Sequence, residues 1–150
     1  MNDLSIPILT QYVKAQLANL AVLREYQRNN NDPYVRSALA LTIEDTQEAI
    51  ARASSRLRQL GQPVSDQTLD EAGEKLLRQF RSRQKMEDKL KFVRHGLKYQ
   101  LEWSQARFKD LKGDADSQAI LVALAEQNRV RLERWETMMK DLKVELDERV

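Results

Sequence analysis

Apolar residues recur three and four positions apart through four long segments of the chain, a spacing that places them on one face of an α-helix. Only four glycines and three prolines occur among the 150 residues, so helices of many turns can run unbroken. No segment alternates apolar and polar residues as a half-buried strand does. The first segment shows the helical spacing at Leu9, Tyr12, Val13, Leu17, Leu20, Leu23 and Tyr26. The sequence therefore predicts an all-α protein.

Turn and capping residues divide the chain into four expected helices, at about 7–28, 33–60, 74–112 and 116–147. Asp32 precedes Pro33, the pattern of an N-cap followed by proline at the first helical position. Asp114 or Asp116 is expected to cap the last helix. The loops between the first and second helices and between the third and fourth are short, so each joins antiparallel neighbours. The sequence thus predicts one domain over residues 1–150, an antiparallel four-helix bundle of two helical hairpins joined by a longer crossover connection.

Composition excludes several chemistries. The chain has no cysteine, which rules out disulfides, thiolate metal sites and cysteine nucleophiles. No apolar run approaches the roughly 18–20 residues of a membrane span, and the first nine residues lack the features of a signal peptide. A cytoplasmic protein without membrane association is the expectation. The formal net charge of +2 is too small to indicate a nucleic-acid partner by itself.

The chain resembles the ferritin-like superfamily of four-helix proteins. The resemblance rests on the two expected hairpins, the long connection between them, and a second helix that ends on Leu57–Gly61. The segment Ala123–Arg129 is also similar to the Glu-x-x-His segment of the family's fourth helix. The resemblance covers nearly the whole chain. It implies a bundle that in the family holds two metal ions with one Glu from each of two helices and a Glu-x-x-His motif from each of the others.

The chain departs from this ligand pattern at its critical positions. The second-helix motif falls on Glu44 and Gln47, and the fourth-helix motif falls on Glu126 and Arg129, so both histidines are replaced. The first helix offers no acid between residues 3 and 25, and the chain contains a single histidine, His95, where the site needs two. We therefore expect no di-metal centre, no cofactor and no enzymatic activity that depends on one.

A metal-free polar network is the expected replacement at the middle of the bundle. Three inward-facing carboxylates would repel one another unless Arg129 neutralised them. The candidate network consists of Glu44, Gln47, Glu102, Glu126 and Arg129. Two alternatives stay open: these groups lie in water on the flanks of the apolar stripes, or the register is shifted by one. The shifted motifs are the ranges 43–46 and 125–128.

The expected third helix is too long for its neighbours. Its 39 residues at 74–112 would span about 58 Å. Its N-terminal part must therefore either fold back over the bundle or pack on a second subunit, and Trp103 and Trp135 are either core residues or anchors of a subunit contact. The sequence thus predicts a homodimer with the candidate interface Leu76, Leu77, Phe80, Trp103 and Trp135.

The function predicted from these features is that of a non-catalytic structural or protein-interaction module with an unidentified protein partner. One alternative is an atypical carboxylate metal-binding protein, for storage or redox chemistry, using Glu44, Glu102 and Glu126. A second is nucleic-acid binding through the basic third helix. This second alternative is disfavoured because the basic residues are distributed around the helix and do not line one ridge.

Overall fold

A computed structural model describes residues 4–63 and 68–146 of the chain, and all regular structure within those ranges is helical. The five α-helices are α1 (Ser5–Arg28), α2 (Pro33–Gln59), α3 (Glu71–Arg81), α4 (Met86–Arg107) and α5 (Ala115–Asp141), and a short 3-10 helix, η1 (Phe108–Leu111), follows α4. The prediction of an all-α protein is confirmed. In the same ranges, no helix is long and apolar enough to cross a membrane.

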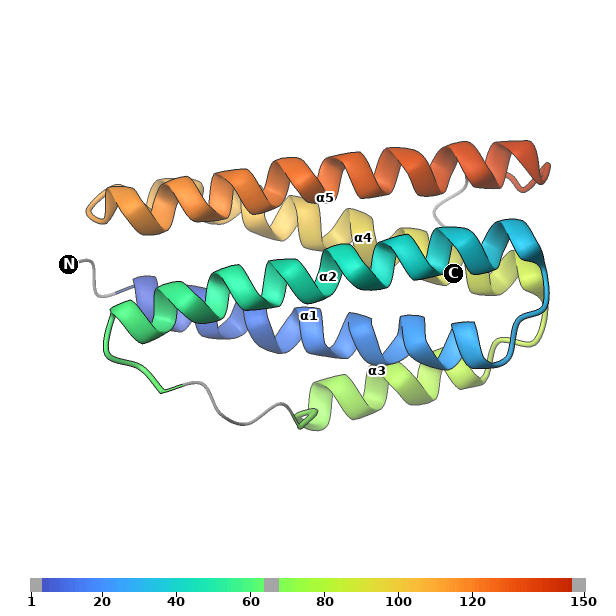
Figure 1. Ribbon diagram of the computed structural model, residues 1–150, viewed down its shortest axis with the longest axis horizontal. Coiled ribbons are helices and arrows are strands. Elements are labelled where there is room, and N and C mark those ends of the chain that lie inside the picture. Colours follow the sequence, from blue (N-terminus) through green and yellow to red (C-terminus); the bar gives the residue numbers. More distant parts are fainter. Residues whose placement is uncertain (1–3, 64–67, 147–150) are drawn as a thin grey trace.

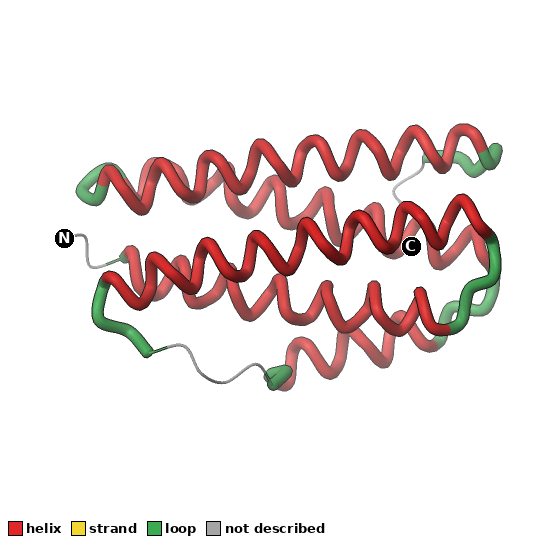
Figure 2. The backbone as a smooth tube through the Cα atoms, viewed as in Figure 1, coloured by secondary structure: helices red, strands yellow, loops and turns green. Residues whose placement is uncertain are grey.

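The long helices α1, α2, α4 and α5 lie side by side, and the shorter α3 lies against α1 (Figure 1). Helix α1 packs on α2 and α4, and α5 packs on the same two helices. Each of these neighbouring pairs is antiparallel, whereas α2 and α4 run in the same direction (Figure 1). The connection from α2 to α4 must therefore travel back along the molecule, and α3 makes most of this return (Figure 2).

The prediction of one continuous helix over residues 74–112 is wrong. The segment forms two helices, α3 and α4, separated by a turn at residues 82–85, and it closes with η1. Residues 81–85 are Arg-Ser-Arg-Gln-Lys and include no apolar side chain, so no packing favours a continued helix there. Reversal at this turn lets α3 bury Leu77 and Phe80, and the Phe80 ring lies 5.5 Å from the Tyr26 ring and 5.6 Å from the Phe92 ring.

The N-cap residue of α2, α3 and α5 is in each case an aspartate. The carboxylate of Asp32 accepts a hydrogen bond from Val35 N–H at 3.0 Å, and that of Asp114 accepts one from Ser117 N–H at 3.2 Å. Both residues were predicted as caps, Asp114 as one of two options. The last helix ends earlier than predicted, at Asp141. The predicted end at residue 147 lies outside the described residues.

Two apolar clusters fill the interior. Tyr26, Leu39, Leu90 and Trp135 belong to the cluster near the α1–α2 loop, and the Trp135 indole N–H donates to Leu90 O at 2.9 Å. The other cluster, toward the opposite end, includes Leu9, Val13, Leu57, Leu111 and Leu124. On α2 and α5, polar residues at 42, 46, 128 and 131 separate the members of the two clusters. The middle of the molecule is therefore polar.

Candidate functional site

The centre of the molecule holds a set of buried polar side chains that we call the central polar layer. Its members are Tyr12, Gln16, Thr46, Gln100, Asn128 and Arg131. Gln16 donates to Gln100 Oε1 at 3.3 Å, and Thr46 donates to the Thr42 carbonyl at 2.7 Å. Asn128 donates to Leu97 O at 3.0 Å. Helices α1, α2, α4 and α5 all contribute to the layer.

Arg131 is the least satisfied member of this layer. The side chain is 1% exposed, and its Nη2 donates to Asn128 Oδ1 at 3.3 Å. Its Nε and Nη1 groups have no hydrogen-bond partner, and within the described ranges it forms no ion pair. Burial lowers the pKa of the Arg131 guanidinium below its usual value. The buried Tyr12 hydroxyl also lacks a hydrogen-bond partner, and burial raises its pKa while the nearby Arg131 charge opposes that rise.

A cavity of about 570 Å³ opens between α1, α3 and α4, and we call it the α1–α3–α4 cavity. Its lining includes the buried side chains of Gln16, Thr46 and Gln100, so the cavity reaches the central polar layer. The apolar part of the wall includes Ala15, Ala18, Val22, Leu23, Leu76, Phe92, Val93 and Leu97. The cavity therefore combines apolar surface with a set of buried polar side chains, as ligand pockets commonly do.

The charged residues of this cavity are mostly cationic. Lys14 and Arg83 line it, and Asp70 is the one acid among the described residues of the wall; its carboxylate accepts a hydrogen bond from Gly73 N–H at 2.8 Å. The Arg83 guanidinium stacks 5.1 Å above the centre of the Phe92 ring, and its Nε is buried without a hydrogen-bond partner. The lining therefore favours an apolar molecule with a negative or neutral polar end.

The polar network predicted from the sequence does not form. Glu44, Gln47, Glu102 and Glu126 are all exposed. Arg129 pairs with Glu126 at 2.5 Å and also with Glu133, both on its own helix, at the surface. The rotation of α5 is set by its apolar stripe, and residues 126 and 129 lie off that stripe. The carboxylates lie in water, as the first open alternative holds. At the ends of the two shifted motifs, Thr46, Ala125 and Asn128 are buried and Ile43 is half-buried, and the shift itself stays a prediction.

The candidate interface residues are mostly inside the chain. Leu77, Phe80 and Trp135 are buried by the chain's own helices, because α3 folds back over α1. Leu76 is half-buried and lines the α1–α3–α4 cavity. Trp103 is half-buried, and the Arg107 guanidinium lies 4.8 Å from its ring centre. Leu77, Phe80 and Trp135 therefore do not offer a free surface to a second subunit.

No metal-ligand cluster is evident in the described part of the chain. Within residues 4–63 and 68–146, no three histidine, aspartate or glutamate side chains gather as a metal site would require. The three carboxylates of the metal-binding alternative, Glu44, Glu102 and Glu126, are exposed.

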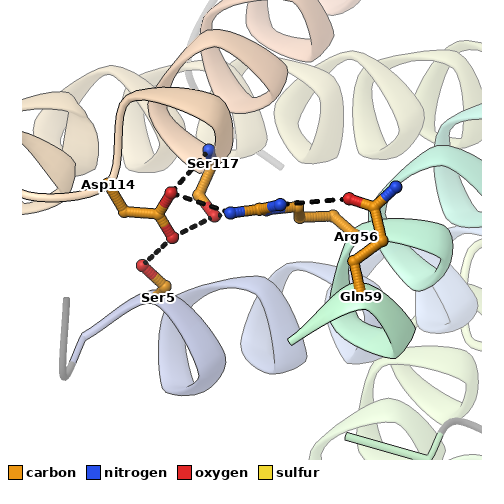
Figure 3. A network of polar contacts seen from close by, with 5 residues as sticks. All are labelled: Ser5, Arg56, Gln59, Asp114 and Ser117. Atoms are coloured by element: carbon orange, nitrogen blue, oxygen red, sulfur yellow. Dashed lines mark hydrogen bonds and ion pairs between the residues drawn. The ribbon is translucent and has the colours of Figure 1, made fainter. Parts of the chain in front are cut away.

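A second polar cluster joins α1, α2 and α5 at the end of the molecule away from the α1–α2 loop (Figure 3). Asp114 accepts from the Ser5 hydroxyl at 2.8 Å and pairs with Arg56 Nη2 at 2.9 Å. Arg56 also donates from Nε to Ser117 Oγ at 2.9 Å and from Nη1 to Gln59 Oε1 at 3.0 Å. Every nitrogen of this guanidinium has an acceptor, in contrast to Arg131. The arrangement is that of a structural clamp on α1, α2 and α5.

Sequence reasoning missed Arg131, Tyr12, Gln16, Gln100 and the cavity. One signal was present: Arg131 lies seven residues from both Leu124 and Met138, which is two helical turns along the apolar stripe. The cavity had no sequence signal, because it depends on where α3 packs. Comparison of the chain with known protein families, with curated proteins and with solved structures found no match. These comparisons lend no support to the ferritin-like resemblance, and the function must be argued from geometry.

Proposed function

We propose that this chain is a non-catalytic binding module, a four-helix, ferritin-like bundle whose α1–α3–α4 cavity holds a small amphipathic ligand. The observation that carries the proposal is the cavity itself. Its volume of about 570 Å³ is in the range of small-molecule sites. The ferritin-like arrangement is supported by the two antiparallel pairs, α1 with α2 and α4 with α5, and by the long return through α3 (Figure 1).

The shape of the cavity suits a linear molecule. Its α1 wall extends from Gln11 to Leu23, a rise of about 18 Å along the helix. The apolar residues Val22, Leu23 and Phe92 lie toward the α3–α4 turn, and the amides of Gln11 and Gln100 lie toward the other end. A ligand with an acyl chain and a polar head matches this division, because each part would lie against side chains of its own polarity.

The chemistry of the lining supports binding more than catalysis. Among the residues that the structure describes, the wall contains one histidine, His95, and one carboxylate, Asp70. Within the described ranges, no hydrogen bond or ion pair joins His95 to a carboxylate, so the usual arrangement of a positioned general base is missing there. The remaining polar groups of the wall are mostly amides, hydroxyls and cations, which bind and orient ligands.

Neither alternative function gains a specific observation. The exposed Glu44, Glu102 and Glu126 do not form a metal cluster. Several basic residues of α3 and α4 are held by acids: Arg81 by Glu25 at 3.1 Å, and Arg94 by Glu136 at 2.7 Å. Such pairs leave fewer cations for the phosphates of a nucleic acid.

A homodimer, an unidentified protein partner and a cytoplasmic location stay predictions. Residues 74–112 do not form one overlong helix, because α3 folds back over α1, so helix length gives no reason to expect a second subunit. Exposed apolar residues on α2 and α5, among them Leu41 and Val130, are the remaining surface that supports self-association. We expect a mass near 35 kDa, twice the 17.5 kDa of the chain, in sedimentation equilibrium. A mass of one chain at all concentrations up to about 100 μM, a range in which weak dimers form, would contradict the dimer.

Binding in the cavity is tested by filling it. Ala15 lines the α1–α3–α4 cavity, and an indole placed there occupies space that a ligand needs. We expect Ala15→Trp to weaken the binding of decanoate and decanol, measured by isothermal titration calorimetry, by at least about tenfold, since roughly 1.4 kcal/mol of lost contact is sufficient.

Ala51→Trp is the matched control, because Ala51 is exposed on α2 and does not line the cavity. Its binding is expected to equal that of the unchanged chain. Circular dichroism spectra establish that both variants keep their helices. Failure of both probes to bind the unchanged chain, or equal binding by both variants, would contradict the proposed function.

A further inference from the structure

Arg131 carries a buried charge that forms no ion pair with the described residues. The Asp45 carboxylate lies near enough to attract it but pairs with Arg134 at 2.6 Å. Two other buried or half-buried arginines do pair with carboxylates: Arg56 with Asp114 at 2.9 Å and Arg94 with Glu136 at 2.7 Å. Arg131 is more deeply buried than either, at 1% exposure, and donates a hydrogen bond to the neutral oxygen of Asn128. A guanidinium in such surroundings is destabilising unless a negative charge accompanies it.

Two donors of this charge lack an acceptor in good geometry. Within the described ranges, Arg131 Nε–H and Nη1–H have no hydrogen-bond partner, and neither does the nearby Tyr12 hydroxyl, which can donate as well as accept. The side-chain amide of Gln16 already donates to Gln100 Oε1, and that of Asn128 already donates to Leu97 O. A water molecule could accept some of these hydrogen bonds but would leave the charge in place. A carboxylate accepts several and neutralises the charge as well.

Arg131 is linked to the cavity lining through Asn128. Leu97 lines the α1–α3–α4 cavity, its carbonyl accepts from Asn128, and Asn128 accepts from Arg131, so one side chain joins the guanidinium to a lining residue. Gln16 and Gln100, which also line the cavity, are joined by a hydrogen bond that is long, at 3.3 Å. Arg131 does not itself line the cavity, so a polar head that reaches it must move side chains of this lining.

We propose that Arg131, with Tyr12, is the receptor for a single carboxylate at the centre of the molecule. The carboxylate has two possible sources: the head of an acyl chain that occupies the cavity, which rests on the proposed function, or a small free carboxylate such as formate. In both cases the carboxylate accepts hydrogen bonds from Arg131 Nε and Nη1 and from the Tyr12 hydroxyl. Lys14 is a weaker receptor, because it is exposed and an ion pair in water contributes little.

The test compares decanoate with decanol, which share a chain and differ in the charge of the head. Titration calorimetry on the unchanged chain is expected to show decanoate bound at least about tenfold more tightly, as a charge-assisted hydrogen bond to a buried group provides. In Arg131→Met this ratio is expected to fall to about one. Arg129→Met is the matched control, because Arg129 lies on the same helix at the surface and its acids are Glu126 and Glu133. Its ratio is expected to stay unchanged.

Formate distinguishes the two sources. If a free carboxylate is the ligand, sodium formate raises the melting temperature of the unchanged chain above that in sodium chloride of equal ionic strength, and this difference is lost in Arg131→Met. Should Arg131→Met fail to fold, Tyr12→Phe serves in its place, since it removes one donor and keeps the ring. Its decanoate-to-decanol ratio is expected to fall several-fold.

The outcomes separate this inference from the proposed function. Equal binding of decanoate and decanol by the unchanged chain, together with no formate effect that depends on Arg131, overturns the carboxylate receptor and leaves the cavity function intact. A decanoate preference that survives Arg131→Met, or Tyr12→Phe in its place, overturns the receptor as well when formate has no such effect. If neither decyl probe binds but formate stabilises only chains that keep Arg131, the receptor stands and the cavity function fails. No binding of either probe and no formate effect overturns both.

Discussion

Trp135→Ala is expected to lower the free energy of unfolding by about 3–5 kcal/mol, the range found for removal of a buried aromatic side chain. Trp135 is 1% exposed and packs in the apolar cluster with Leu90 and Met138. The substitution leaves a large cavity between α4 and α5. It also removes the hydrogen bond that the indole donates to Leu90 O, a carbonyl that lies within α4. Urea unfolding followed by far-ultraviolet circular dichroism measures the loss.

Trp103→Ala is the matched control for this substitution. Trp103 is half-buried at the edge of one apolar cluster, and the guanidinium of the half-buried Arg107 lies over its ring. A loss of about 1–2 kcal/mol is expected, because less apolar area leaves contact. Equal losses for the two variants would contradict the assignment of Trp135 to the interior. A loss at Trp135 that depends on protein concentration would instead place this residue at a subunit contact.

The helices could be predicted from the sequence because local signals determine them. Apolar spacing indicated every long helix, Asp32 was predicted as a cap, and Asp114 was one of the two caps predicted for the last helix. The division of residues 74–112 into α3 and α4 had a local cue as well, since residues 81–85 lack any apolar side chain. That cue does not predict a break by itself, because charged residues can also form a turn of helix. The reversal of the chain is determined by the apolar area that Leu77 and Phe80 bury on α1.

The candidate site was harder to predict because its residues break the apolar pattern instead of forming a motif. Asn128 lies four residues after Leu124 and four before Leu132, so it shares their buried face. The search for carboxylate ligands instead favoured Glu126 and Arg129, which lie on the far side of the same helix. A search for polar residues on apolar stripes would have found Gln16, Asn128 and Arg131. The cavity depends on the packing of α3, which no local signal determines.

Asp114→Ala is expected to lower the free energy of unfolding by about 3 kcal/mol, since it removes one partner of a mostly buried pair. Asp114 and Arg56 have side chains 6% and 13% exposed, and the carboxylate also caps α5 and accepts from Ser5 (Figure 3). Asp116→Ala is the control, because Asp116 is an exposed acid in the same first turn of α5. Its loss is expected to be under about 1 kcal/mol. Thermal and urea unfolding at pH 7 measure both.

Acid gives an independent measure of the same clamp. Burial would raise the pKa of Asp114, but hydrogen bonds from Ser117 and Ser5 and the charge of Arg56 lower it to about 2. The folded pKa is thus below the unfolded value of about 3.9, so ionised Asp114 stabilises the fold above pH 4 by about 2 kcal/mol, and this contribution is lost between about pH 4 and pH 2. Asp114→Asn lacks this titration while the other carboxylates keep theirs. The difference in stability between the two chains should therefore be constant above about pH 5 and shrink by about 2 kcal/mol toward pH 2. A difference that stays constant to pH 2 would mean that Asp114 titrates alike in the folded and unfolded chains, and that Arg56 does not hold it as an ion.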